Sequence, residues 1–201
     1  MCDSWIEVIK EWQTLVAGLL ALGAAFLTIR TMRKQMVNES IRHESQLRRQ
    51  KKAARAKMPD ALSEMSEYAR QVGGYLLETQ EEPPQPPSAS ITTLQQVIEY
   101  IDDDAADRAF ELASLFQVQH ARMTSSGPKR QHILHKYDIA LLQAYTNSLF
   151  DYARNEVESV SNEKPSREDM RTATVNVFDR IRINQNRPLF SELQKLIESK
   201  H

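Results

Sequence analysis

The longest apolar run lies near the amino terminus of the 201-residue chain. Residues 12–29 read WQTLVAGLLALGAAFLTI, which is 18 positions without a charged side chain. A helix needs about 20 apolar residues to cross a hydrocarbon core about 30 Å thick, and 18 lies within the usual range. The run is apolar on every side and lacks the polar stripe of a surface helix. It therefore predicts a transmembrane helix, with a buried helix of a soluble protein as the alternative.

The segment 30–58 is polar and basic. It contains neither Gly nor Pro, and Pro59 follows it, so we expect the helix to continue through this segment and to stop at the proline. The apolar seam of Ile29, Met32 and Met36 is not continued at the same spacing, and no coiled coil is specified beyond it. We predict a solvated stalk or semi-rigid linker, with disorder in isolation as the alternative.

Apolar residues recur at spacings of three and four throughout residues 59–201, and this period predicts helices. A first helix is expected over 60–79, and a Pro-rich linker over 80–90, where the prolines favour polyproline II. The pattern predicts further helices around 94–101, from Asp104 to before Gly127, over 129–160, from Ser166 through Ile181, and from Pro188 onward. The predicted fold is all-α: a transmembrane helix, a basic helical stalk and an irregular helical bundle.

The first predicted helix of the bundle contains a core-facing stripe interrupted by two glycines. The stripe residues are Leu62, Met65, Ala69, Val72 and Leu76. Gly73 and Gly74 each weaken a helix by about 1 kcal/mol relative to Ala, so they require a reason. Close packing or a bend is the simple interpretation, and a functional hinge is the alternative.

Charge predicts the orientation of the membrane helix. Residues 1–11 carry a net charge of −2, whereas residues 30–57 contain ten basic and two acidic residues, a net charge of +8. Basic residues next to a span stay on the cytoplasmic side. We therefore expect the short amino terminus outside the cell membrane, with Trp5 and Trp12 at the outer interface, and a cytoplasmic domain over 59–201. A cleaved signal peptide would need its positive charge before the apolar run.

Basic residues cluster at the end of the stalk, and we call this set the basic neck: Arg48, Arg49, Lys51, Lys52, Arg55 and Lys57. It could bind anionic lipid headgroups, and a plain solvated neck is the alternative. No aromatic residues for base stacking surround it, which argues against nucleic acid as a partner. On an upright stalk Arg48 would lie about 27 Å from the membrane surface, so lipid contact would require the stalk to lie down.

Three potential metal ligands lie on one predicted helix. His132, His135 and Asp138 are spaced three residues apart, which places them near one face. A structural zinc or di-iron site needs further ligands from other helices, and an exposed polar face is the alternative interpretation. The single cysteine, Cys2, excludes an internal disulfide and a cysteine-based zinc motif. No cofactor or catalytic motif is predicted.

Small residues form one face of the predicted transmembrane helix: Ala17, Gly18, Ala21, Ala24 and Ala25. Such faces let two helices approach closely in lipid, where packing drives association. The pattern predicts a homo-oligomer formed through the anchor. Small residues are also common in transmembrane helices that do not associate.

The opening sequence WQTLVAGLLALGAAFLTIRTMRKQM resembles the anchor of many uncharacterised small bacterial single-pass membrane proteins. This resemblance covers about the first 36 residues, and it implies a bacterial cytoplasmic membrane without implying an activity. The sequence thus favours a membrane-anchored helical module for protein interaction or scaffolding, with an unknown protein partner. The alternatives are a tethered metal-binding or enzymatic domain and a lipid-responsive regulator that uses the basic neck.

Overall fold

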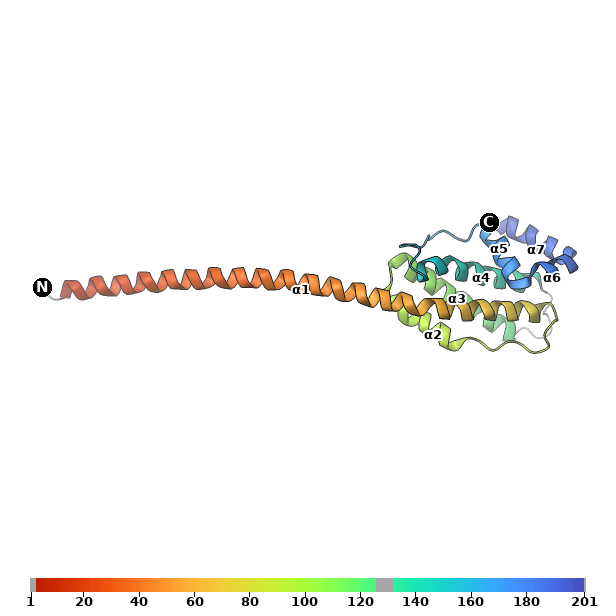
Figure 1. Ribbon diagram of the computed structural model, residues 1–201, viewed down its shortest axis with the longest axis horizontal. Helices are drawn as coiled ribbons and strands as arrows, with labels where there is room; N and C mark the ends of the chain where they lie inside the picture. Colours follow the sequence, from red (N-terminus) through yellow and green to blue (C-terminus); the bar gives the residue numbers. More distant parts are fainter. Residues whose placement is uncertain (1–2, 126–131, 201) are drawn as a thin grey trace. The chain divides into compact units, whose positions relative to one another are not determined.

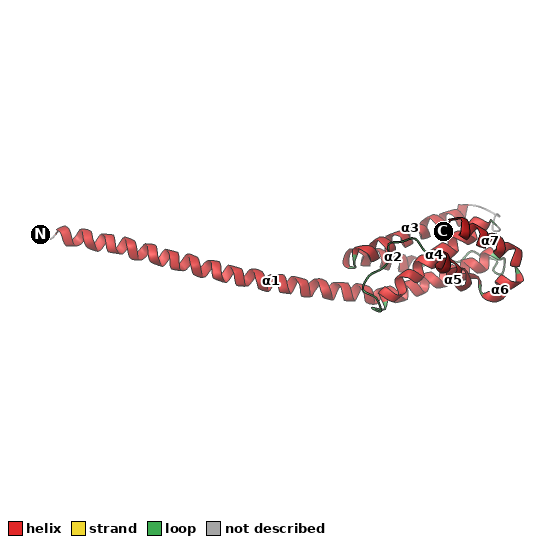
Figure 2. Cartoon of the chain, turned by 90° about the horizontal axis from the view of Figure 1, so that it is seen from above, coloured by secondary structure: helices red, strands yellow, loops and turns green. Residues whose placement is uncertain are grey.

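The computed structural model describes residues 3–125 and 132–200, and within them every regular element is a helix (Figure 2). The elements are α1 (Asp3–Leu76), α2 (Ser88–Val97), the 3₁₀ helix η1 (Ile98–Tyr100), α3 (Asp103–Ser125), α4 (Ile133–Ala153), α5 (Arg167–Phe178), α6 (Arg180–Gln185) and α7 (Arg187–Lys200). The all-α prediction is confirmed. The chain divides into two compact units, Met1–Arg49 and Gln50–His201.

α1 contributes residues to both units. The expectation that the helix stops at Pro59 was wrong, because α1 continues through this proline to Leu76. A proline inside a helix removes one backbone hydrogen bond and costs about 3 kcal/mol. Met58 and Leu62, on either side of it, are completely buried in the core of the second unit, and their burial offsets that cost.

The second unit begins earlier than the boundary expected at residue 59. Ala54, Arg55 and Met58 are buried, and Ala54 and Met58 belong to the hydrophobic core. They continue the stripe of Leu62 and Met65 toward the amino terminus at spacings of three and four. The last residues of the predicted stalk are therefore part of the bundle.

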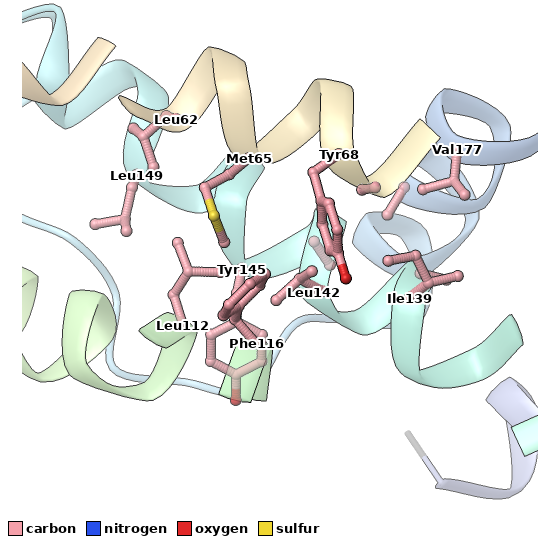
Figure 3. Packing of buried hydrophobic residues seen from close by; sticks show 14 of the residues in the cluster. Leu62, Met65, Tyr68, Leu112, Phe116, Ile139, Leu142, Tyr145, Leu149 and Val177 are labelled. Carbon is pink, nitrogen blue, oxygen red and sulfur yellow. The ribbon is translucent and has the colours of Figure 1, made fainter. Parts of the chain in front are cut away.

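Helices from distant parts of the chain meet around α1 in the second unit. Leu62, Met65 and Tyr68 of α1 are directed toward side chains of α3 and α4 (Figure 3). The loop after α1 leads the chain back, so that α2 runs beside the carboxyl-terminal part of α1 (Figure 1). Ser90 of α2 donates its hydroxyl proton to the Glu64 carboxylate of α1. All five residues of the predicted stripe from Leu62 to Leu76 are buried.

α4 is the central helix of the bundle, as its apolar residues on two faces predict. Tyr137, Leu142, Leu149 and Tyr152 are buried, and α4 packs against α3, α5 and α7. It is shorter than the predicted 129–160 and begins at Ile133. Residues 126–131, which include the predicted stop at Gly127 and Pro128, lie outside the described residues.

The carboxyl-terminal helices follow their capping signals except at one point. Ser166 and Asp169 form the capping box that opens α5. Asp179 then adopts a φ of 62°, which ends the helix, so Ile181 lies in α6 and is exposed instead of continuing the α5 stripe. α3 begins at Asp103, one residue before the Asp104 expected as its cap.

Close packing explains Gly73. A Cβ atom at this position would lie 2.6 Å from Cγ1 of Val177 and 3.0 Å from the Val177 carbonyl oxygen. α1 and α5 therefore approach each other at a distance that only glycine permits.

Candidate functional site

The uncharged segment forms an exposed apolar surface in the first unit. Its large side chains are about half to two-thirds exposed: Trp12, Leu15, Val16, Leu19, Leu20, Leu22, Phe26, Leu27 and Ile29. Within this part of the helix, the Thr28 hydroxyl donates to the Ala24 carbonyl at 2.8 Å. The helix is long and apolar enough to cross a membrane.

The predicted small-residue face lies on this surface. Ala17, Gly18, Ala21, Ala24 and Ala25 are exposed, and an added Cβ atom at Gly18 would meet no described atom within 4 Å. Close approach of a second helix is therefore sterically open here. Association of two copies stays a prediction.

The basic neck is divided between exposed and structural residues. Arg48, Arg49, Lys52 and Lys57 are exposed, as a binding surface requires. Arg55 is only 2% exposed, so its assignment to a lipid-facing surface was wrong. Its position on the α1 stripe, three residues before Met58 and seven before Leu62, is the sequence signal that indicates burial.

The Arg55 guanidinium holds the end of α4 and the loop that follows it. Nε and Nη2 donate to the Tyr152 carbonyl at 2.9 and 2.6 Å, and Nη2 also donates to the Val157 carbonyl at 2.7 Å. The guanidinium carbon lies 4.0 Å from the ring centroid of Tyr152. Nη1 lies 3.4 Å from the carboxylate of Glu158. The planar fork of arginine thus donates to two backbone carbonyls and stacks on an aromatic ring.

The Tyr152 hydroxyl links this arginine to the start of α3. It donates to Asp102 Oδ2 at 2.7 Å, and Lys51 Nζ lies 2.8 Å from Asp102 Oδ1. Burial by itself would raise the pKa of Asp102, but the hydrogen bonds from Lys51 and Tyr152 outweigh it and lower the pKa. Burial raises the pKa of Tyr152 to about 12, so its hydroxyl remains a donor. Lys51 and Arg55 therefore join α1 to both α3 and α4.

A second buried arginine repeats this arrangement. Arg108 of α3 is 2% exposed, and its Nη2 donates to the carbonyls of Ser161 and Glu163 at 2.6 and 2.5 Å. Its guanidinium carbon lies 4.5 Å from the ring centroid of Tyr145, two turns before Tyr152 on α4. Both arginines fix the connection between α4 and α5, and neither role follows from the local sequence pattern.

Two of the three metal candidates have other partners, whereas the buried Nδ1 of His135 accepts or donates no hydrogen bond among the described residues. His132 is the N-cap of α4, where Nδ1 accepts from the Leu134 amide at 3.3 Å. Asp138 forms an ion pair with Arg122 at 2.8 Å. His135 is partly buried, and burial lowers its pKa. In the described parts of the chain, no group of three His, Cys, Asp or Glu side chains is arranged to hold a metal ion.

Clefts of moderate size lie on the second unit. One of about 440 Å³ is lined by residues of α1, α2 and η1, including Lys57, Val97 and Tyr100. A cleft of about 360 Å³ lies beside Arg108 and the start of α5. Another, of about 340 Å³, is formed by polar side chains of α1, α4 and α5, among them Arg70 and Arg154.

The chain has no match among known protein families, curated proteins or solved structures.

Proposed function

We propose that the protein is a single-pass membrane protein whose helical bundle serves as an interaction or scaffolding module at the membrane surface. One observation carries the anchoring: 18 consecutive residues without charge form a helix whose large apolar side chains are exposed. In water such a surface is unfavourable at about 25 cal/mol for each Å² of apolar area, whereas in a bilayer it is solvated by lipid.

The charges on either side of the span support a cytoplasmic location for the bundle. Arg30, Arg33 and Lys34 follow the span directly, and Asp3, Glu7 and Glu11 precede it with only Lys10 to oppose them. The positive-inside rule then puts the amino terminus outside. The resemblance of the anchor to those of small bacterial proteins supports the bacterial cytoplasmic membrane as its location.

The continuity of α1 supports a role of the bundle as a module that is fixed at the membrane. The helix that contains the span also contributes Met58, Leu62 and Met65 to the core, so the attachment point is part of the folded domain. A partner bound to this domain would be retained at the membrane. We therefore propose a protein partner, together with a second copy of the chain associated through the small-residue face of the anchor.

Anionic lipid is a second candidate ligand, favoured by one observation. Arg48, Arg49, Lys52 and Lys57 retain exposed side chains, and each basic residue near an anionic surface contributes about 1 kcal/mol of attraction. The proposed contact uses these four residues and omits Arg55. Co-sedimentation with anionic but not neutral vesicles, abolished by high salt, is the expected result.

Membrane fractionation tests the anchor. We expect the full-length protein to remain with membranes after carbonate extraction and Leu20→Arg to shift it toward the soluble fraction, since a central charge costs about 2.5–3.5 kcal/mol. Phe110→Arg, at an exposed position on α3, is the matched control and should leave the distribution unchanged. Equal extraction of wild-type protein and Leu20→Arg would refute the anchor.

Co-purification in detergent tests the module. We expect a stoichiometric protein partner with the full-length chain and none with a chain truncated after Arg49, which keeps the anchor alone. A partner that is retained by the truncated chain would assign binding to the anchor and refute the role of the bundle.

A further inference from the structure

The polar cleft formed by α1, α4 and α5 has a composition that differs from an ordinary helix junction. Ser66 and Arg70 of α1 face it from one side, and Asn147 and Arg154 from the α4 side. Its volume is about 340 Å³. Among the described residues that line it, two carry positive charge and none carries a carboxylate. The cleft therefore favours a negatively charged occupant over a cation.

A buried glutamine determines which polar groups this cleft presents. Gln143 is 3% exposed, and its Nε2 donates to Ser66 Oγ at 2.9 Å and to Asn147 Oδ1 at 2.8 Å. The acceptor atoms of Ser66 and Asn147 are thus occupied beneath the cleft. Their own protons, the Ser66 hydroxyl and the Asn147 amide, have no acceptor among the described residues. The cleft consequently offers these hydrogen-bond donors, next to one acceptor, the buried Oε1 of Gln143, which has no partner among the described residues.

The two arginines supply further donors, and they differ in whether a carboxylate is paired with them. Arg70 forms an ion pair with Glu67 at 2.6 Å, one turn earlier on α1. Arg154 lies beside the Phe150 ring, with its guanidinium carbon 5.2 Å from the ring centroid, and it pairs with no carboxylate in the described part of the chain. Its charge is therefore available, and an arginine fork matches the oxygens of a phosphate or carboxylate group.

We propose that this cleft binds a phosphate-type oxyanion. Arg154 provides the main charge, Arg70 the second, and Ser66 and Asn147 donate hydrogen bonds in the orientation that Gln143 imposes. The phosphate belongs either to a small soluble molecule or to a lipid headgroup, because both present the same oxygens. The residues of this cleft all belong to the second unit and none belongs to the membrane span, so phosphate binding is tested independently of the anchor.

Equilibrium dialysis of the full-length protein in uncharged detergent tests the site. The probe is radiolabelled inorganic phosphate, with ionic strength held constant by sodium chloride. We expect saturable binding of one phosphate per chain, and Arg154→Gln should weaken it at least tenfold. Arg171→Gln is the matched control, because Arg171 is an exposed arginine of α5 outside the cleft and should leave binding unchanged. Absence of saturable binding, or equal affinity in the two variants, would overturn the proposal.

A second variant separates the donor arrangement from charge alone and from misfolding. Asn147→Asp keeps the size of the side chain but replaces the amide donor by a carboxylate, so phosphate affinity should fall at least tenfold while the helical circular dichroism is retained. Affinity unchanged in Asn147→Asp would also overturn the proposal. Displacement of the phosphate by nanodiscs that contain phosphatidic acid, but not by neutral nanodiscs, would identify a headgroup as the source. Without such displacement, the source is a soluble oxyanion.

Discussion

The guanidinium carbon of Arg55 lies 4.0 Å from the ring centroid of Tyr152, and the same side chain donates two hydrogen bonds to the carbonyl of that tyrosine. Arg55→Ala would leave the carbonyls of Tyr152 and Val157 without this donor. We expect the free energy of unfolding to fall by about 3 kcal/mol, measured by urea unfolding followed by circular dichroism. Lys52→Ala, an exposed neighbour, should change it by less than about 0.5 kcal/mol. A similar small effect of both variants would contradict the structural role of Arg55.

The boundary at Gln50 makes a second prediction. A fragment over 59–201 lacks Ala54, Arg55 and Met58, whereas Gln50–His201 retains them. We expect the shorter fragment to be less stable by about 4 kcal/mol or more, or to remain unfolded, because it loses a buried Met side chain and the arginine hydrogen bonds. Thermal unfolding of the two fragments measures the difference. Equal stability would restore the boundary at residue 59.

Acid should weaken the junction of α1, α3 and α4 through Asp102. Its pKa is lowered in the folded protein, so the carboxylate contributes stability at pH values above the usual pKa of about 3.9, and this contribution is lost as the pH falls below that value. The difference in Tm between wild-type protein and Asp102→Asn should be largest near neutral pH and shrink below pH of about 4. Asp103→Asn, at an exposed neighbouring position, serves as the control. A difference that stays constant with pH would contradict this assignment.

Gly73→Ala should destabilise the bundle although alanine favours a helix by about 1 kcal/mol. The added Cβ would overlap with Val177, and overpacking of this kind costs about 1–3 kcal/mol. Gly74→Ala is the control, because its added Cβ would lie 3.2 Å from the Thr79 hydroxyl, a side-chain atom that can shift. Chemical unfolding of both variants compares them. A larger loss of unfolding free energy in Gly74→Ala than in Gly73→Ala would contradict the assignment of the close helix contact to Gly73.

Association of the anchor should depend on Ala21. Its exposed side chain lies in the small-residue face, and Ala21→Leu would keep two helices apart. If the amino terminus faces the oxidising outer compartment, two copies of Cys2 can form a disulfide. We therefore expect a disulfide-linked dimer on non-reducing gels for the wild-type protein and no such dimer for Ala21→Leu. Leu20→Ile, outside that face, should retain it. A dimer that persists in Ala21→Leu would refute this interface, and labelling of Cys2 from the cytoplasm alone would refute the orientation.

Local sequence patterns were sufficient for most of the helices. The stripe from Leu62 to Leu76 and the capping box of Ser166 and Asp169 depend on residues within a few turns, and the structure confirms both. The uncharged run of residues 12–29 likewise identifies its helix without knowledge of any neighbour. Periodicity and capping act over short distances, so these features can be read from the chain alone.

Tertiary contacts decided the features that local rules predicted incorrectly. Helix propensity ends α1 at Pro59, but the burial of Met58 and Leu62 keeps the helix intact through it. Charge puts Arg55 on the surface, but the carbonyls of Tyr152 and Val157, about 100 residues away, provide partners in the interior. Likewise, His132 and Asp138 have sequence spacing suited to a metal, but the helix amino terminus and Arg122 occupy them. The sequence alone determines periodicity and charge, whereas the partner of a polar side chain depends on which distant segment packs against it.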